Sequence, residues 1–170
     1  AYLAQPKLNL PTLFLNIPNN LVLSENQIAL SMRPEDEALQ AAALLSQKQF
    51  KQPIVFSHQD STSLRIANAF VQKWADLTGE KPTIVKFEQG KKMQSVLKET
   101  LAVDKSQARI KALEYRLRET LKTESRNRRD IDMIYIVGNP LQTRLLKPYI
   151  DVNISPFSSL IPVFASSRSH

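Results

Sequence analysis

Three residues that could form a hydrolytic triad lie close together in the first half of the chain. Ser57, His58 and Asp60 offer the hydroxyl, imidazole and carboxylate of such a relay. Side chains so close in sequence rarely meet in the required geometry, and no G-x-S-x-G turn surrounds the serine. We therefore interpret these residues as a polar strand-to-helix turn, in which the hydroxyls of residues 61–63 cap the start of the helix.

Other common catalytic and metal-binding patterns are missing from the sequence. The chain has no cysteine, and its two histidines, His58 and His170, lack metal-ligand spacing. Only three glycines are present, none of them in the turn after the central strand, and no GxxxxGK[ST] loop occurs. The sequence therefore predicts no catalytic residues, no metal and no cofactor. We expect a protein that is not an enzyme.

The polar turn belongs to a strand–turn–helix unit around which the rest of the chain is organised. Residues 53–57 form an apolar run without alternation, which predicts a strand covered on both faces. The following helix places apolar side chains at i, i+4, i+8 and i+11, namely Ile66, Phe70, Trp74 and Leu77. Gly79 then marks the end of the helix.

Strands and helices alternate on either side of this unit. Strands are predicted at residues 10–16, 27–31, 83–87, 133–138 and 160–165. Helices are predicted from Pro34, over residues 91–123 with a break near Asp104, and from Pro140 to near Pro148. Their inner faces carry Ala38, Ala41, Ala42 and Leu45 in the first helix and Leu141, Leu145 and Leu146 in the last. This alternation predicts parallel β-α-β units and a three-layer α/β lobe.

Nearly all of the net charge lies in one segment. Residues 105–129 contain nine basic and three acidic residues and so carry +6 of the chain's +7. Charge runs are most often solvated helix faces. On this interpretation the segment is an amphipathic helix whose buried face carries Ile110, Leu113, Leu117 and Leu121. A docking surface for an acidic protein or an anionic polymer is the alternative, and a third is nucleic-acid binding by residues 109–129, for which only Tyr115 offers stacking. We expect three exposed arginines to serve partner binding more than stability: Arg109, Arg116 and Arg118.

The length and the chain ends bound the domain organisation. With 170 residues, 42% of them hydrophobic, the chain can bury one sizeable core. It begins at Ala1 without an initiator methionine or a signal peptide, and no apolar run approaches the roughly 18 residues of a membrane span. We expect a fragment of something longer, with any export signal outside it.

Several segments, in order, resemble a known family. They are Ala29-Leu30-Ser31 with residues 33–38, Ala-Asn-Ala-Phe at residues 67–70 with Trp74, residues 132–137, and Ala-Ser-Ser-Arg-Ser at residues 165–169. Together they resemble the C-terminal region of the LpoA family of penicillin-binding protein activators, outer-membrane lipoproteins of Gram-negative bacteria. The Ala-Asn-Ala-Phe and Ala-Ser-Ser-Arg-Ser runs are the more specific of these segments.

The resemblance implies a type 1 periplasmic binding protein-like fold, in which two α/β lobes are joined by crossing strands. Residues 1–32 would form part of the first lobe and a crossover strand, residues 33–162 the second α/β lobe, and residues 163–170 the end of the last strand and the return crossover. It also implies a protein without covalent chemistry of its own, which binds and activates a bifunctional class A penicillin-binding protein. Its place would be the periplasm, with a lipidated cysteine upstream of this chain as outer-membrane anchor.

A small-molecule receptor that uses the cleft between the lobes is the alternative. Ligands of open parallel sheets bind at the carboxyl ends of the strands. The residues predicted near this rim are Ser57, Gln59, Asp60, Asn139, Ser166 and Arg168. Muropeptides and amino acids are the ligands to consider, so peptidoglycan fragments join the synthase as candidate partners, whereas a nucleic-acid partner is not expected.

Overall fold

A parallel four-stranded sheet forms the centre of the molecule. The computed structural model describes residues 10–15, 23–30, 33–88, 90–154 and 159–170. The strands are β3 (Pro53–His58), β4 (Thr83–Phe87), β5 (Met133–Val137) and β6 (Val163–Ala165), in the order β4-β3-β5-β6. Val55 of β3 is paired with Ile84 on one side and with Tyr135 on the other. The strand of the central unit therefore lies between two neighbouring strands.

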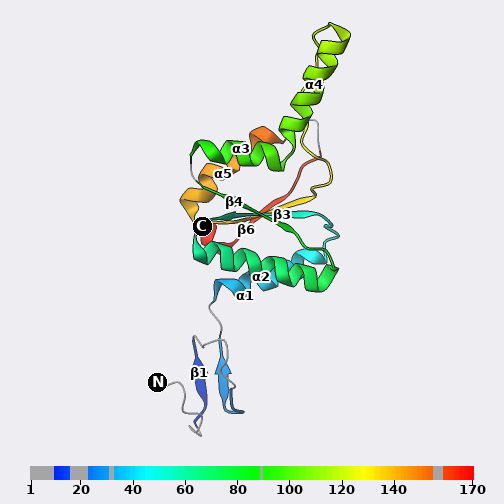
Figure 1. The fold of residues 1–170 in the computed structure, drawn as a ribbon. Coiled ribbons are helices and arrows are strands. Elements are labelled where there is room, and N and C mark those ends of the chain that lie inside the picture. The colour runs from blue at the N-terminus through cyan, green and yellow to red at the C-terminus, as the bar shows by residue number, and fades with distance from the viewer. Residues whose placement is uncertain (1–9, 16–22, 31–32, 89, 155–158) are drawn as a thin grey trace.

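Helices cover both faces of this sheet. α1 (Pro34–Ser46) and α2 (Ser61–Thr78) pack on one face, and α3 (Lys91–Thr100) and α5 (Pro140–Asn153) lie on the other (Figure 1). All three strand pairings are parallel. The predicted three-layer α/β lobe is confirmed.

Each face of the sheet has its own hydrophobic core. On the α1–α2 side, Phe70 stacks on Tyr135 with ring centroids 4.2 Å apart and on Trp74 at 5.8 Å. On the α3–α5 side, Phe56 and Ile136 pack against residues of the two helices, including Leu97 and Leu146. β5 is buried at every position, which explains its unbroken apolar sequence.

α2 ends at a glycine, as predicted, but its start is capped by a different residue from the one predicted. Gly79 ends the helix with φ 77°, the left-handed conformation that glycine adopts readily. At the start, the side chain of Asp60 accepts a hydrogen bond from the Ser63 N–H, so the cap is Asp60 and not a hydroxyl of residues 61–63. A carboxylate is favoured at this position because it also meets the positive end of the helix dipole.

Three leucines predicted to face the core are exposed. Leu77 is 49% exposed, Leu141 61% and Leu145 41%. The buried residues of α5 are Leu146 and Ile150 instead. When a helix carries apolar residues on two sides, helical spacing does not determine which side packs on the sheet. For this reason the prediction that Leu141 and Leu145 lie on the buried side is wrong.

The sequence predicts that α5 ends near Pro148, but the proline lies inside the helix. The helix continues to Asn153, where the side-chain amide donates to the Tyr149 carbonyl at 2.7 Å. Burial of Ile150, two residues beyond the proline, favours the continued helix, and it outweighs the hydrogen bond that the proline cannot donate.

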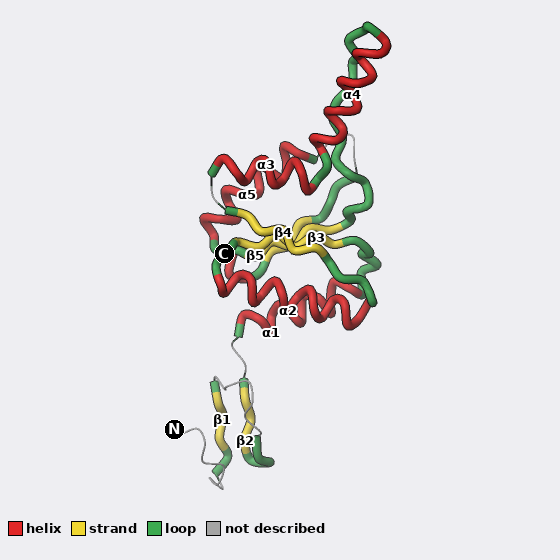
Figure 2. Tube along the Cα trace, in the orientation of Figure 1, coloured by secondary structure: helices red, strands yellow, loops and turns green. Residues whose placement is uncertain are grey.

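The long predicted helix is two helices, and the second leaves the body of the protein. α3 ends at Thr100, Ala102 adopts φ 54°, and α4 (Val103–Leu117) starts slightly before the predicted break. α4 projects beyond the α3–α5 layer (Figure 2). Leu113 and Leu117 are 49% and 56% exposed, so the prediction that they are buried is wrong, whereas Ile110 and Leu121 are half-buried. The helix also ends at Leu117 rather than near residue 123, and residues 120–128, which return the chain to the lobe, form neither helix nor strand.

A second, small sheet lies apart from the main one. It consists of β1 (Thr12–Phe14) and β2 (Gln27–Ala29), paired in parallel (Figure 2). Both strands were predicted, but Leu13 and Ile28 are 62% and 69% exposed rather than buried. Among the described residues, no helix has the length and apolar character needed to cross a bilayer.

Candidate functional site

Polar side chains from three elements meet at the carboxyl edge of the main sheet, around Asp60. His58 ends β3, and its Nδ1 lies 2.9 Å from Asp60 Oδ2. Ser63, in the first turn of α2, donates from its N–H at 2.9 Å and from its hydroxyl at 2.7 Å. Arg168, from the C-terminal 3-10 helix (Ser167–Ser169), places Nη1 3.1 Å from Asp60 Oδ1. One carboxylate therefore joins β3, α2 and the C-terminal segment.

This network determines the charge of Asp60. Partial burial raises the pKa of the carboxyl group, but the hydrogen bonds from Ser63, His58 and Arg168 lower it by more. The net pKa of Asp60 lies well below its ordinary value. Asp60 is therefore ionised at neutral pH, which suits a helix cap and an ion pair but not a general acid.

The C-terminal segment is fixed by two further contacts. Glu37 of α1 accepts a hydrogen bond from the Ser167 N–H at 2.7 Å, and also one from the Ser167 hydroxyl. Ser169 receives a hydrogen bond from Thr143 at 3.0 Å and donates to the Gly138 carbonyl at 3.1 Å. The segment is thus attached to α1, α2 and α5 together.

The structure separates the rim residues predicted from the sequence. Asp60 and Arg168 form the ion pair, and Gln59 beside them is exposed. Asn139 caps α5 in a reciprocal capping box with Gln142. Two of the six lie beneath the rim rather than on it, because Ser57 is 0% and Ser166 2% exposed. A ligand-binding role for the set stays a prediction.

The triad-like residues do not form a relay. His58 and Asp60 are in contact, but the Ser57 hydroxyl donates to the His58 backbone carbonyl at 3.0 Å and not to the imidazole. Within the described part of the chain, no group of three His, Cys, Asp or Glu side chains could hold a metal ion. The chemistry available here is hydrogen bonding and ion pairing.

Sequence reasoning missed several members of the network. Glu37 and Ser167 are far apart in the chain, and no local pattern connects them. Gln142 had a signal, because Asn139 and Gln142 have the spacing of a capping box. Ser169 belongs to the Ala-Ser-Ser-Arg-Ser run, but no pattern pairs it with Thr143, and only the fold brings the two together.

Among the hollows on the described surface, two lie at opposite edges of the main sheet. One of about 480 Å³ adjoins the carboxyl edge and is lined by the start of α1 together with Ser167 and Arg168. Another, of about 290 Å³, lies at the opposite, amino edge of the sheet, between Lys51, Thr83 and Ile131. The first is bordered by the network around Asp60, and the second is remote from it.

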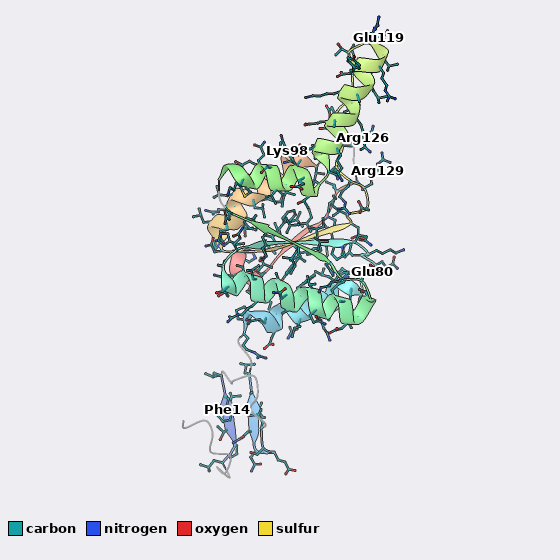
Figure 3. The ribbon with its side chains drawn as sticks, viewed as in Figure 1. Phe14, Glu80, Lys98, Glu119, Arg126 and Arg129 are labelled. Atoms are coloured by element: carbon teal, nitrogen blue, oxygen red, sulfur yellow. The ribbon has the colours of Figure 1, made fainter. Side chains whose placement is uncertain are left out.

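The three arginines predicted to bind a partner are all exposed on the projecting part of the chain. Arg109 and Arg116 belong to α4, and Arg118 follows its last residue with φ 55°. Glu119, the next residue after Arg118, marks the far end of the projection in Figure 3. The partner-binding role of these arginines stays a prediction.

The fold is that of an α/β lobe of the periplasmic binding protein-like structural class. A structure described as a putative branched-chain amino acid ABC transporter from Chromobacterium violaceum matches with TM-score 0.61 and 19% identity, over 96% of this chain and 43% of that one. The LpoA (YraM) C-domain from Haemophilus influenzae, described as a regulator of PBP1A, matches with TM-score 0.59 and 23% identity, over 94% of this chain and 41% of that one. At these identities the likeness establishes the fold.

The sequence adds the family. The family described as "LppC putative lipoprotein" matches residues 2–170, and the chain belongs to it. A curated relative from Aliivibrio fischeri, named penicillin-binding protein activator LpoA, is 35% identical over 158 residues, which are 93% of this chain and 26% of the relative. The resemblance noted from the sequence is confirmed, and the chain spans about a quarter of the length of this relative.

Proposed function

We propose that this chain is part of a lipoprotein that activates a class A penicillin-binding protein by binding it, and so promotes peptidoglycan synthesis. The observation that carries the proposal is the family match over residues 2–170. The name of the Aliivibrio relative and the description of the Haemophilus C-domain agree with it. They describe an activator and a regulator, so the protein acts through binding rather than catalysis. None of these names favours the small-molecule receptor.

The same proposal assigns the parts of the chain to two lobes. Residues 33–162 are the second α/β lobe, residues 1–32 part of the first lobe with a crossover strand, and residues 163–170 lead back toward the first lobe. The exposed Leu13 and Ile28 support this assignment, because further strands and helices of a first lobe would cover them. A lipidated cysteine upstream of this chain anchors the protein to the outer membrane, facing the periplasm.

The direct test is the activity of the synthase. The full-length protein is added to its purified class A penicillin-binding protein, and glycan polymerisation and peptide cross-linking are measured. The proposal predicts a saturable rise in at least one of the two rates. No change in either rate at saturating protein would refute it.

A further inference from the structure

α4 carries a row of cations on one side. Lys105, Arg109 and Arg116 stand at i, i+4 and i+11, with Ala112 at i+7 between them. At 3.6 residues per turn, the three cations fall within an arc of about 40°. All three side chains are exposed. We call these three residues the cationic stripe.

The stripe has no acidic counterpart in the described part of the chain. Elsewhere arginines pair with carboxylates, as Arg65 does with Glu35 at 2.8 Å. No ion pair of the described residues includes a member of the stripe. Glu114 lies on the opposite side of α4, where its carboxylate accepts a hydrogen bond from the Leu121 N–H at 3.1 Å. Within the described residues, no carboxylate therefore neutralises the stripe through a close ion pair.

The stripe also lies where the fold does not need it. Val103 and Ser106 are buried at the base of α4, and Ser106 accepts a hydrogen bond from the Arg126 N–H at 3.0 Å. Beyond the base, α4 carries the chain outward, up to the tip at Glu119 (Figure 3). The 15 residues of the helix correspond to about 22 Å. A projection of this length with exposed charges contributes little to folding and is well placed to reach another molecule.

We infer that the cationic stripe docks on an acidic surface of the penicillin-binding protein, an inference that rests on the proposed function. Leu113 borders the stripe beside Arg109 and is 49% exposed, so it supplies an apolar contact next to the charges. The complementary surface is a row of carboxylates that flanks an apolar patch. Opposite charges of this kind accelerate association and fix the orientation of the complex.

The composition of the helix favours a protein over a membrane as the partner. A helix that lies in a lipid interface carries an apolar face opposite its cations. The exposed apolar residues Leu113 and Leu117 lie to one side of the stripe, and the face opposite the stripe presents Gln107 and Glu114. Nucleic acid is disfavoured as well, because Tyr115 is the one aromatic side chain of α4 that could stack on bases.

Matched charge reversals in the full-length protein test the stripe. The variant Arg109→Glu/Arg116→Glu changes two cations of the stripe, and Lys111→Glu/Lys122→Glu makes the same change in charge at two exposed cations outside the stripe, one in α4 and one after it. Binding to the periplasmic part of the synthase is titrated at low and high salt. We expect the stripe variant to bind about tenfold or more weakly at low salt, mainly through slower association, and the control variant to keep its affinity within about twofold.

The possible failures have different meanings. Equal loss in both variants, or no loss in either while the unmodified protein binds, overturns the stripe and leaves the proposed function standing. Failure of the unmodified protein to bind overturns both. Anionic phosphatidylglycerol vesicles and double-stranded DNA are titrated in parallel. If the stripe is needed for vesicles or DNA but not for the synthase, the acidic protein surface is the wrong partner.

Discussion

At the scale of single residues, Asp60 connects most of the polar edge. It caps α2 through Ser63, and it pairs with Arg168 from the end of the chain. Replacement Asp60→Ala removes both interactions, and the loss of the cap alone costs about 0.5–2 kcal/mol. Urea unfolding followed by circular dichroism measures the effect. The exposed neighbour Gln59→Ala serves as the control and should leave stability unchanged, and an equal loss in both variants would contradict the capping role.

The low pKa of Asp60 predicts a dependence of stability on pH. The folded pKa is depressed, so the unfolded chain binds a proton at this carboxyl group at a higher pH than the folded chain does. The stabilisation is complete above the unfolded pKa of about 4, and it is lost as the pH falls from there toward the folded pKa. The difference in unfolding free energy between the unmodified chain and Asp60→Asn should therefore shrink in acid. A difference that grows as the pH falls would contradict this assignment.

Trp74 is a core residue, as its helical spacing predicts. The side chain is 0% exposed and stacks on Phe70. Trp74→Ala should lower the unfolding free energy by about 3–5 kcal/mol, because it leaves a large cavity. Leu77→Ala, on the same helix but 49% exposed, should cost less than about 1 kcal/mol. If chemical unfolding gave similar losses of unfolding free energy for the two variants, the assignment of Trp74 to the core would be wrong.

At the scale of elements, Pro148 is the clearest local conflict. It lies exposed within α5 and cannot donate to the Arg144 carbonyl. Pro148→Ala should raise the unfolding free energy by about 1–2 kcal/mol. Alanine is more favourable than proline in a helix interior by about 3 kcal/mol, but part of this gain is offset because alanine also gives the unfolded chain more conformational freedom. Lys147→Ala is the neighbouring control, and it should change stability by less than about 0.5 kcal/mol. Destabilisation by Pro148→Ala would mean that the proline serves the packing of α5.

Elements with one strong local signal could be predicted from the sequence. β3, β5 and the course of α2 follow from continuous apolar runs, from the spacing of Ile66, Phe70 and Trp74, and from Gly79. Predictions failed where a tertiary contact overrides a local preference. Pro148 is the example in α5. Leu113 in α4 is the converse case, because no helix of the described part of the chain packs over this apolar side chain.

The candidate site was less predictable than the fold. Asp60 and Arg168 could be placed at one edge, because the carboxyl ends of parallel strands lie together. The contacts of Glu37 with Ser167 and of Thr143 with Ser169 depend on the path of the C-terminal segment, which no local pattern records. The burial of Ser57 and Ser166 likewise follows from the packing around them.

At the scale of the whole molecule, the chain combines a compact lobe with two features that the lobe does not bury. One is the β1–β2 sheet with its exposed apolar side chains, and the other is α4 with the cationic stripe. Both suit a fragment of a larger binding protein. The first faces the remainder of its own chain in our proposal, and the second faces the synthase.

The most direct test of the central claim is a binding titration of the full-length protein against the periplasmic part of its class A penicillin-binding protein. The account predicts saturable binding that parallels the rise in synthase activity and weakens with salt, because charged surfaces meet. Absence of binding at low salt, with both proteins folded and the synthase active, would contradict the account.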